Sequence, residues 1–313
     1  MHTLRCAPCS GHLLFYEFDN LLCEGISVIT NSLLSDLQWL QASLPIREGG
    51  LGIRHASLLA LSTFLASAAS TTFLQDLLLQ SATSSRDHRV MLGHASWSQL
   101  YSANCPTEDS AFKQRTWDAP AVTRDWHCIW DHAKCDLDKA RLVTIKSPHS
   151  SDWLFALPVS TCGLRLSDEA IRIAVSLRLG LNLCEPHICP RDANVDARGL
   201  HSLSCKCGTG RSSRYQQLND IIWQALKRAD IPATEEPAGL VQGYEKRSDG
   251  LTLVPWQDGR CLTWDATIVD TLAVSYVPIG STASNGAADA AAARKHAKYD
   301  THFGHTYLRT CSG

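Results

Sequence analysis

Apolar residues recur at spacings of three and four over two N-terminal stretches, and this periodicity predicts helices over 21–44 and 55–80. The apolar stripe of the second stretch consists of Leu58, Leu61, Phe64, Leu65 and Ala68. Proline and glycine interrupt the pattern over 44–54. Because these residues break helices and form turns, the segment is predicted to be an ordered loop that joins the two helices.

The pattern changes between Ser81 and Ser151 to short clusters of Ser, Thr, Asp and His, which are typical of a connector. Four tryptophans are interleaved with these clusters: Trp97, Trp117, Trp126 and Trp130. Such rings can form a platform on which bases stack. Packing in a core is the interpretation that we favour, since buried aromatic rings contribute large apolar areas.

Two further segments differ in how clearly their periodicity can be interpreted. Residues 171–179 alternate apolar and polar, which favours a strand, whereas Asp168 and Glu169 suit the first turn of a helix. Both alternatives remain open for this segment. Residues 214–228 carry one apolar stripe at helical spacing and predict an amphipathic helix.

The C-terminal part begins with two β-like runs, 251–256 and 260–269. They flank Gln257-Asp258-Gly259, which suits a three-residue hairpin loop with the glycine in the left-handed conformation. The alanine-rich segment 287–299 then predicts a helix. The order helix, strand, strand, helix, placed after a helical N-terminal half, predicts the fold class α+β with a small α/β core at the C-terminal end.

Composition narrows the class of protein. A chain of 313 residues, 44% hydrophobic and 19% charged, is typical of a globular protein of about two domains. A net charge of −2 argues against coating nucleic acid through bulk charge. Without a run of 18 apolar residues, we expect no membrane span.

A local basic patch is the candidate for contact with phosphate groups. Its members are Lys206, Arg211, Arg214, Lys227 and Arg228. The segment 206–228 that contains them has a single acidic residue, Asp220. A solvated helix face is the alternative interpretation.

Cysteine and histidine spacing predicts a structural zinc site. Thirteen cysteines are an odd number, and the N-terminus lacks the pattern of a secretion signal, so metal ligation or buried thiols are favoured over disulfides. Cys184-x4-Cys189 and His201-x3-Cys205 supply four soft ligands in two short-spaced pairs, with His187 and Cys207 close by. Incidental thiols in a cysteine-rich chain are the alternative.

Acidic residues around the predicted hairpin suggest a second metal site. A three-residue loop places Asp265 opposite Leu251, with Asp249 diagonally on the same face. Two carboxylates in such an arrangement can hold Mg²⁺. Glu236, expected at the end of the preceding helix, is a candidate to join them.

Lysines on the last predicted helix could complete this site. Lys295 and Lys298 lie about one turn apart on one face of that helix. A lysine beside a metal can orient the attacking water and stabilise charge on a phosphate. The order Glu, Asp, Asp, Lys matches the arrangement of the PD-(D/E)xK nucleases.

Several motifs resemble the C-terminal part of non-LTR retrotransposon proteins that carry a restriction-like endonuclease. The motifs are QWLQASLPIREGGLGIR at 38–54, FLASAAS at 64–70, GLHSLSC at 199–205, EPAGL at 236–240, KRSDGLTLVPW at 246–256, GRCLTWDATIVDTLAVSY at 259–276 and RKHAKY at 294–299. Together these motifs span most of the chain.

The resemblance implies four segments. Residues 1–85 would be a helical remnant of the reverse transcriptase thumb, 86–165 a connector, 166–210 a linker helix with a zinc-finger-like segment, and 211–313 the endonuclease domain. The polymerase palm is absent from this sequence, so no reverse transcription is expected.

The resemblance also implies roles for individual residues and for the whole chain. Asp249 and Asp265 would bind Mg²⁺ or Mn²⁺, Lys295 or Lys298 would be the catalytic lysine, and Glu236 a supporting acid. Cys184, Cys189, His201 and Cys205 would bind Zn²⁺. The expected activity is nicking of target DNA for target-primed reverse transcription in the nucleus, with element RNA and the rest of the reverse transcriptase as further partners.

Three positions depart from the family pattern. Ser248 stands where the family has a proline before the first catalytic aspartate. Arg191 stands where a second cysteine often follows Cys189, and Tyr215 stands where a histidine follows the basic residue of the first helix. Two alternatives to an active nuclease therefore stay open: a non-catalytic nucleic-acid-binding remnant, and a translated pseudogene without a function.

Overall fold

The computed structural model describes residues 2–79, 87–205, 209–237, 248–299 and 307–312, and these form two compact units. The first unit comprises Met1–Lys134 and Pro148–Leu181. The second comprises Cys135–Ser147 and Asn182–Gly313. The mixture of helix and sheet agrees with the predicted α+β class. The segment 166–210, expected as one piece, is divided between the two units, with its helix in the first and its cysteines in the second.

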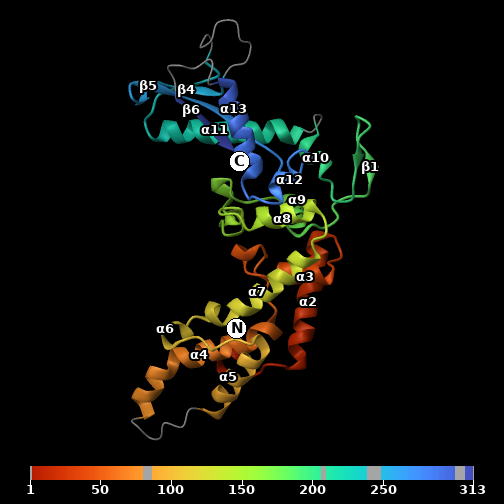
Figure 1. Cartoon of the computed structure of the whole chain (residues 1–313), viewed down its shortest axis with the longest axis vertical. Helices are drawn as coiled ribbons and strands as arrows, with labels where there is room; N and C mark the ends of the chain where they lie inside the picture. Colours follow the sequence, from red (N-terminus) through yellow and green to blue (C-terminus); the bar gives the residue numbers. More distant parts are fainter. Residues whose placement is uncertain (1, 80–86, 206–208, 238–247, 300–306, 313) are drawn as a thin grey trace. The chain divides into compact units, whose positions relative to one another are not determined.

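The first unit is helical (Figure 1). Its helices are α1 (His2–Cys6), α2 (Leu13–Thr30), α3 (Asp36–Ser43), η1 (Ile46–Glu48), α4 (Ala56–Leu79), α5 (His88–Tyr101), α6 (Glu108–Ala111), α7 (Gln114–His132), η2 (Asp152–Leu154), η3 (Ser160–Cys162) and α9 (Asp168–Leu179).

The helix predicted over 21–44 is two helices, so that prediction was wrong. Helix α2 ends at Asn31, which adopts the left-handed conformation with φ 51°. Ser35 then starts α3 through a capping box with Gln38. These two local signals stop and restart the helix, although the apolar periodicity continues across them.

The helix predicted over 55–80 is confirmed as α4. Its start is held by Asp19, whose carboxylate accepts hydrogen bonds from the backbone N–H groups of Ala56 at 2.7 Å and Ser57 at 3.2 Å. Within the described residues, the stretch Ala56–Leu78 alone is long and apolar enough to span a membrane, by length and composition only. Helix α4 packs against α1, α2, α5 and α7, and its buried side chains lie between Leu59 and Ala66, whereas Phe73, Leu77 and Leu78 are exposed.

The loop over 44–54 is ordered, as predicted. Buried Arg178 donates to the backbone oxygens of Ile46 at 2.8 Å and Gly50 at 3.1 Å. A Cβ atom at Gly50 would lie 2.0 Å from the carbonyl oxygen of Leu44, so this position accepts only glycine. The loop thereby closes tightly on the helices around it.

The predicted connector is largely helical and contributes to the core of the first unit. Trp97 of α5 and Trp117 of α7 are fully buried and meet edge to face, with ring centroids 5.2 Å apart. The indole N–H of Trp97 donates to the backbone oxygen of Trp117. The core interpretation is confirmed for these two residues, while Trp126 and Trp130 stack on each other at 6.4 Å.

The ambiguous segment 171–179 belongs to helix α9. Ser167 caps its start by accepting a hydrogen bond from the backbone N–H of Ala170 at 3.2 Å. Gly180 ends it in the left-handed conformation. Signals at the two ends thus prevail over the strict alternation between them.

The second unit combines a four-stranded sheet with helices. Its elements are α8 (Asp136–Ile145), β1 (His187–Ile188), β2 (Asn194–Val195), α10 (His201–Ser204), α11 (Thr209–Arg228), β3 (Ala233–Glu235), β4 (Gly250–Gln257), β5 (Arg260–Thr267), α12 (Val277–Gly280), α13 (Gly286–Tyr299) and β6 (Tyr307–Ser312). The sheet order is β3-β4-β5-β6, antiparallel except for β6, which is parallel to β5. Helix α11 contacts β3 and β5, and α13 contacts β6 (Figure 1).

The predicted helices and strands of this unit are present, but the hairpin differs from its prediction. Gln257 pairs with Arg260, so the loop has two residues, Asp258 and Gly259, and both have positive φ. This is the geometry of a tight turn that matches strand twist. The glycine conformation was therefore predicted correctly and the loop length was not.

The register of the hairpin also differs from its prediction. Irregularities on either side of Pro255 shift the pairing, so Leu251 lies opposite Thr263 and not Asp265. Pro255 has no N–H to donate to the ladder, which explains why the strand departs from regular pairing there. This shift decides how the two acids meet.

Candidate functional site

Asp249 and Asp265 lie side by side at one end of the β4–β5 ladder. Gly250 pairs with Trp264, and the backbone N–H of Asp249 donates to the oxygen of Trp264 at 3.1 Å, so the same register places Asp249 next to Asp265. Both acids are buried, with exposed fractions of 6% and 7%. A Cβ atom at Gly250, the residue after Asp249, would lie 1.9 Å from the Trp264 ring. Only glycine at this position lets the ring lie so close to the backbone of β4.

Both carboxylate oxygens of Asp249 accept hydrogen bonds. The hydroxyl of Tyr215, on α11, donates to Oδ1, and the backbone N–H of Ala266 donates to Oδ2 at 2.5 Å. Burial raises the pKa of Asp249, against the hydrogen bond from Tyr215, and the charge of Asp265 raises it further. Burial likewise raises the pKa of Tyr215, together with its bond to Asp249, so the phenol remains a donor.

Lys295 connects the last helix to the second acid. Its Nζ donates to Asp265 Oδ1 at 2.5 Å and to the backbone oxygen of Ala266 at 2.5 Å. A lysine ammonium has three donors, so one remains for a third acceptor. Two acids, one cation and a phenol thus converge from the residue before β4, from β5, from α13 and from α11.

A cleft of about 910 Å³ lies beside these residues. Its lining is Ser212, Tyr215, Gln216, Asn219, Asp220, Glu235, Glu236, Ala266, Thr267, Ile268 and Lys295. Three acids on its walls make it negative, which favours the entry of cations. Ligands that reach the acid pair can approach through this cleft.

Glu236 lies at the end of a strand, and its predicted place at the end of a helix was wrong. Strand β3 intervenes after α11, and Glu236 follows it with φ 43°. Its backbone N–H donates to the oxygen of Asp249 at 3.0 Å. The exposed side chain lines the cleft beside the acid pair.

The remaining predicted catalytic lysine and the predicted nucleic-acid-binding residues are not seen to join the acid pair. Lys298 and Arg211 belong to α13 and α11, but their side chains lie outside the described residues, as does the whole of Lys206. Arg214 is half-buried and donates to the backbone oxygen of Leu203 at 2.8 Å, which links α11 to α10. Lys227 and Arg228 are exposed at the end of α11.

The cysteine-rich segment brings three of its four predicted ligands together. The ligand atoms of Cys189, His201 and Cys205 all lie within 4.8 Å of one another. Nε2 of His201 is buried and has no hydrogen-bond partner. Backbone N–H groups of Arg191 and Ala193 lower the pKa of the Cys189 thiol, which favours the thiolate that zinc requires.

Cys184 is the predicted ligand that does not join this group. It packs against Cys189, Val195 and Cys205, but its Sγ points to the backbone oxygens of Asp196 and Ala197 at 3.4 and 3.8 Å. The donor set of two thiols and an imidazole fits Zn²⁺, and a structural site would require a fourth ligand.

Sequence reasoning missed the residues that hold the acids in place. Tyr215 was noted only as a departure from a family pattern, and Ala266 contributes through its backbone, which carries no sequence signal. Asn219 accepts a hydrogen bond from the Trp264 indole at 2.8 Å and ties α11 to the sheet. Asn219 is a polar residue next to the apolar stripe of α11, and this is the one sequence feature that could have suggested a hydrogen bond from α11 to the sheet.

Comparison of the sequence with protein-family models gave no match, and comparison with curated proteins gave none either.

Proposed function

We propose that the second unit is a divalent-metal-dependent DNA endonuclease, and that the chain is a fragment of a non-LTR retrotransposon protein that nicks chromosomal target DNA for target-primed reverse transcription. The observation that carries the nuclease proposal is the convergence of Asp249, Asp265 and Lys295 beside an acidic cleft. Element RNA, the rest of the reverse transcriptase and a nuclear location belong to the same proposal through the sequence resemblance.

The acids would hold the ion. Asp249 and Asp265 present buried carboxylate oxygens side by side, which suits Mg²⁺ or Mn²⁺ with several retained waters. A bound divalent ion supplies Lewis-acid polarisation of the phosphate and a more acidic water. Tyr215 and the Ala266 N–H fix the orientation of the Asp249 carboxylate.

Lys295 would act on the phosphate and the water. Two of its protons are directed to Asp265 and the Ala266 oxygen, which orients the ammonium group. The remaining proton can hydrogen-bond a non-bridging phosphate oxygen or the attacking water and stabilise charge in the transition state. Glu236, on the wall of the cleft, would bind waters around the ion.

The test is nicking of supercoiled plasmid by the full-length chain with Mg²⁺ or Mn²⁺. Asp249→Ala should abolish conversion to open circles, because the ion loses one of its two buried ligands. Asp289→Asn, at an exposed acid in the first turn of α13, is the matched control and should cleave like the parent chain. Equal nicking by the parent chain and Asp249→Ala would refute the proposal.

One observation favours a second function, non-catalytic nucleic-acid binding. The ammonium of Lys295 already neutralises Asp265, so the acid pair has an internal cation. Such a chain would bind DNA in the presence of EDTA and leave plasmid intact in every metal. The same plasmid assay, combined with a salt titration of binding, separates the two functions.

A further inference from the structure

A second pocket lies along the same two elements as the acidic cleft. Helix α11 contributes Gln216 and Asp220 to the cleft, and Trp223 and Lys227 to the pocket. These four positions, spaced by four, three and four residues, share one face of the helix. Opposite α11, residues in and next to β3 line both hollows: Glu235 and Glu236 line the cleft, and Pro232 and Ala233 line the pocket.

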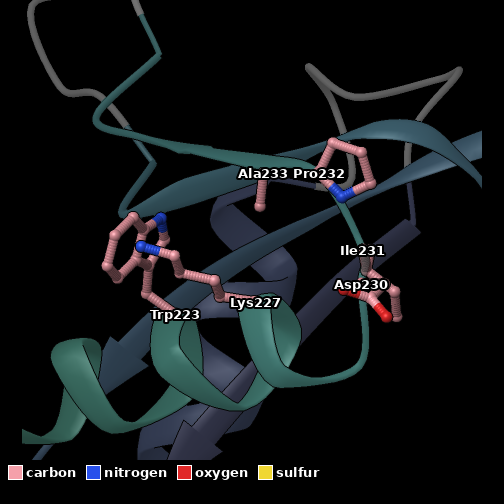
Figure 2. A pocket seen from close by; sticks show the side chains of 6 residues that line it. All are labelled: Trp223, Lys227, Asp230, Ile231, Pro232 and Ala233. Carbon is pink, nitrogen blue, oxygen red and sulfur yellow. The ribbon is translucent and has the colours of Figure 1, made fainter.

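The pocket has an aromatic wall and a cation. It has a volume of about 340 Å³ and is lined by Trp223, Lys227, Asp230, Ile231, Pro232 and Ala233 (Figure 2). The Nζ of Lys227 lies 5.0 Å from the centre of the Trp223 ring. Arg228 follows directly and is exposed. Asp230 on the lining is acidic, so contact with a phosphate falls to Lys227 and to Arg228 just outside the lining, while the flat ring of Trp223 offers a surface on which a base can stack.

We propose that this pocket binds an unpaired base of the DNA strand whose phosphodiester lies at Asp249 and Asp265. The inference rests on the proposed nuclease function and adds the substrate class, a strand with an unpaired base beside the cleavage site. The base stacks on Trp223, displacing the Lys227 ammonium toward the adjacent phosphate. Eight residues separate Tyr215 from Trp223, which is about 12 Å along the helix. At the duplex rise of about 3.4 Å per nucleotide, this separation corresponds to about three to four nucleotides between the bound base and the scissile phosphate.

The charges along the two elements agree with this occupant. The cleft carries Asp220, Glu235 and Glu236, and a phosphate there requires a metal ion. The pocket end carries Lys227 and the neighbouring Arg228 against one acid, Asp230, and this excess of positive charge can hold a phosphate without a metal ion. A strand held at both ends thus has a metal-dependent contact at the acids and a metal-independent contact at the pocket.

The test measures binding of labelled single-stranded DNA to the full-length chain in EDTA, where no cleavage occurs. A second oligonucleotide of the same length, with abasic sites in place of the bases, measures the contribution of phosphate contacts alone. The parent chain should prefer the strand with bases by roughly 5- to 150-fold, and Trp223→Leu, which keeps apolar volume but has no ring, should remove that preference. Trp223→Phe should retain most of it.

Controls separate a pocket effect from misfolding. Trp256→Leu changes a half-exposed tryptophan on β4 that lines neither the cleft nor the pocket, and should bind like the parent chain. Lys227→Gln should weaken binding of both strands and lower the salt slope by about one. Equal affinity of the parent chain for abasic and base-containing strands would overturn the inference, as would tighter binding of an RNA strand of the same sequence.

Failure of the nuclease proposal gives a different result. If plasmid is never nicked but Trp223→Leu loses base-dependent binding, the pocket stands and the catalytic proposal falls. If plasmid is nicked and Trp223→Leu changes neither base-dependent binding nor cleavage of DNA with a mismatched flank, the pocket inference falls alone.

Discussion

The Cys189–His201–Cys205 cluster and the Asp249–Asp265–Lys295 cluster form in opposite ways. The first uses ligands from a short segment, 189–205: Cys189 directly follows β1, His201 begins the single turn of α10, and Cys205 follows that turn. The second uses two strands and two helices whose residues are up to 80 positions apart, from Tyr215 to Lys295. We propose that the local cluster binds zinc and depends on it to hold the segment together, whereas the non-local cluster lies on a sheet that folds without a metal ion.

Removing one ligand of the Cys189–His201–Cys205 cluster should destabilise the protein more than any other substitution proposed here. Cys205→Ser should abolish stoichiometric zinc binding and the order of residues 184–205, since structural zinc contributes about 10–16 kcal/mol of apparent free energy in small zinc-binding peptides. Zinc content and a thermal melt with and without chelator measure this. Cys261→Ser, at a half-buried cysteine on β5, is the control. A melting temperature that changes neither with chelator nor with Cys205→Ser would show that the cluster holds no structural metal.

Breaking the non-local cluster should change activity and spare the fold. Asp265→Asn removes one ligand of the ion and the partner of Lys295, so cleavage should fall by at least about 10²-fold. Zinc content should stay the same, because the cysteine cluster does not share these residues. Plasmid nicking and zinc analysis on one preparation check both points. Loss of zinc in this variant would contradict the independence of the two clusters.

A smaller effect is expected from the residue that orients Asp249. Tyr215→Phe removes one hydrogen bond to the carboxylate and should weaken the apparent Mg²⁺ affinity about 10-fold, with cleavage recovered at high Mg²⁺. Tyr276→Phe is the matched control, because that hydroxyl accepts from Arg294 and does not touch the acids. Unchanged Mg²⁺ dependence would exclude a positioning role for Tyr215.

The smallest expected effect tests a salt bridge beside the cysteine-rich segment. The Asp138 carboxylate accepts from Arg198 at 2.6 Å. Burial opposes ionisation, but the hydrogen bonds from Arg198 and Cys135 prevail and hold the pKa of Asp138 below its ordinary value of 3.8. A depressed pKa stabilises the folded state above the unfolded pKa, and this stability is lost as the pH falls below about 3.8.

Asp138→Asn should therefore lower the free energy of unfolding by about 1–2 kcal/mol at neutral pH. The difference from the parent chain should disappear in acid, as the wild-type carboxyl becomes protonated. Asp136→Asn, at an exposed neighbour in the same helix, should change little at any pH. Thermal melts between pH 2 and 7 follow all three chains. A difference that persists in acid would mean that the salt bridge is not its cause.

Apolar periodicity predicted helices α4 and α11, β-like runs predicted strands β4 and β5, and alanine content predicted helix α13. Helices α4, α11 and α13 and strands β4 and β5 were predicted within a few residues of their bounds. Apolar periodicity failed at Asn31 and Ser35, where short polar signals end one helix and start the next, and it left the segment of α9 open between strand and helix. Caps act over one turn and can override a pattern that extends over ten residues.

Residue types and their spacing were enough to predict the side chains available for the chemistry: two acids near a hairpin, a lysine on the last helix, and cysteines and a histidine at ligand spacing. The tertiary structure alone decided that Asp249 lies beside Asp265, that Tyr215 holds it, and that Cys184 turns away from the other thiols. Spacing along a chain describes local geometry, whereas strand register and side-chain direction follow from packing against residues distant in the sequence.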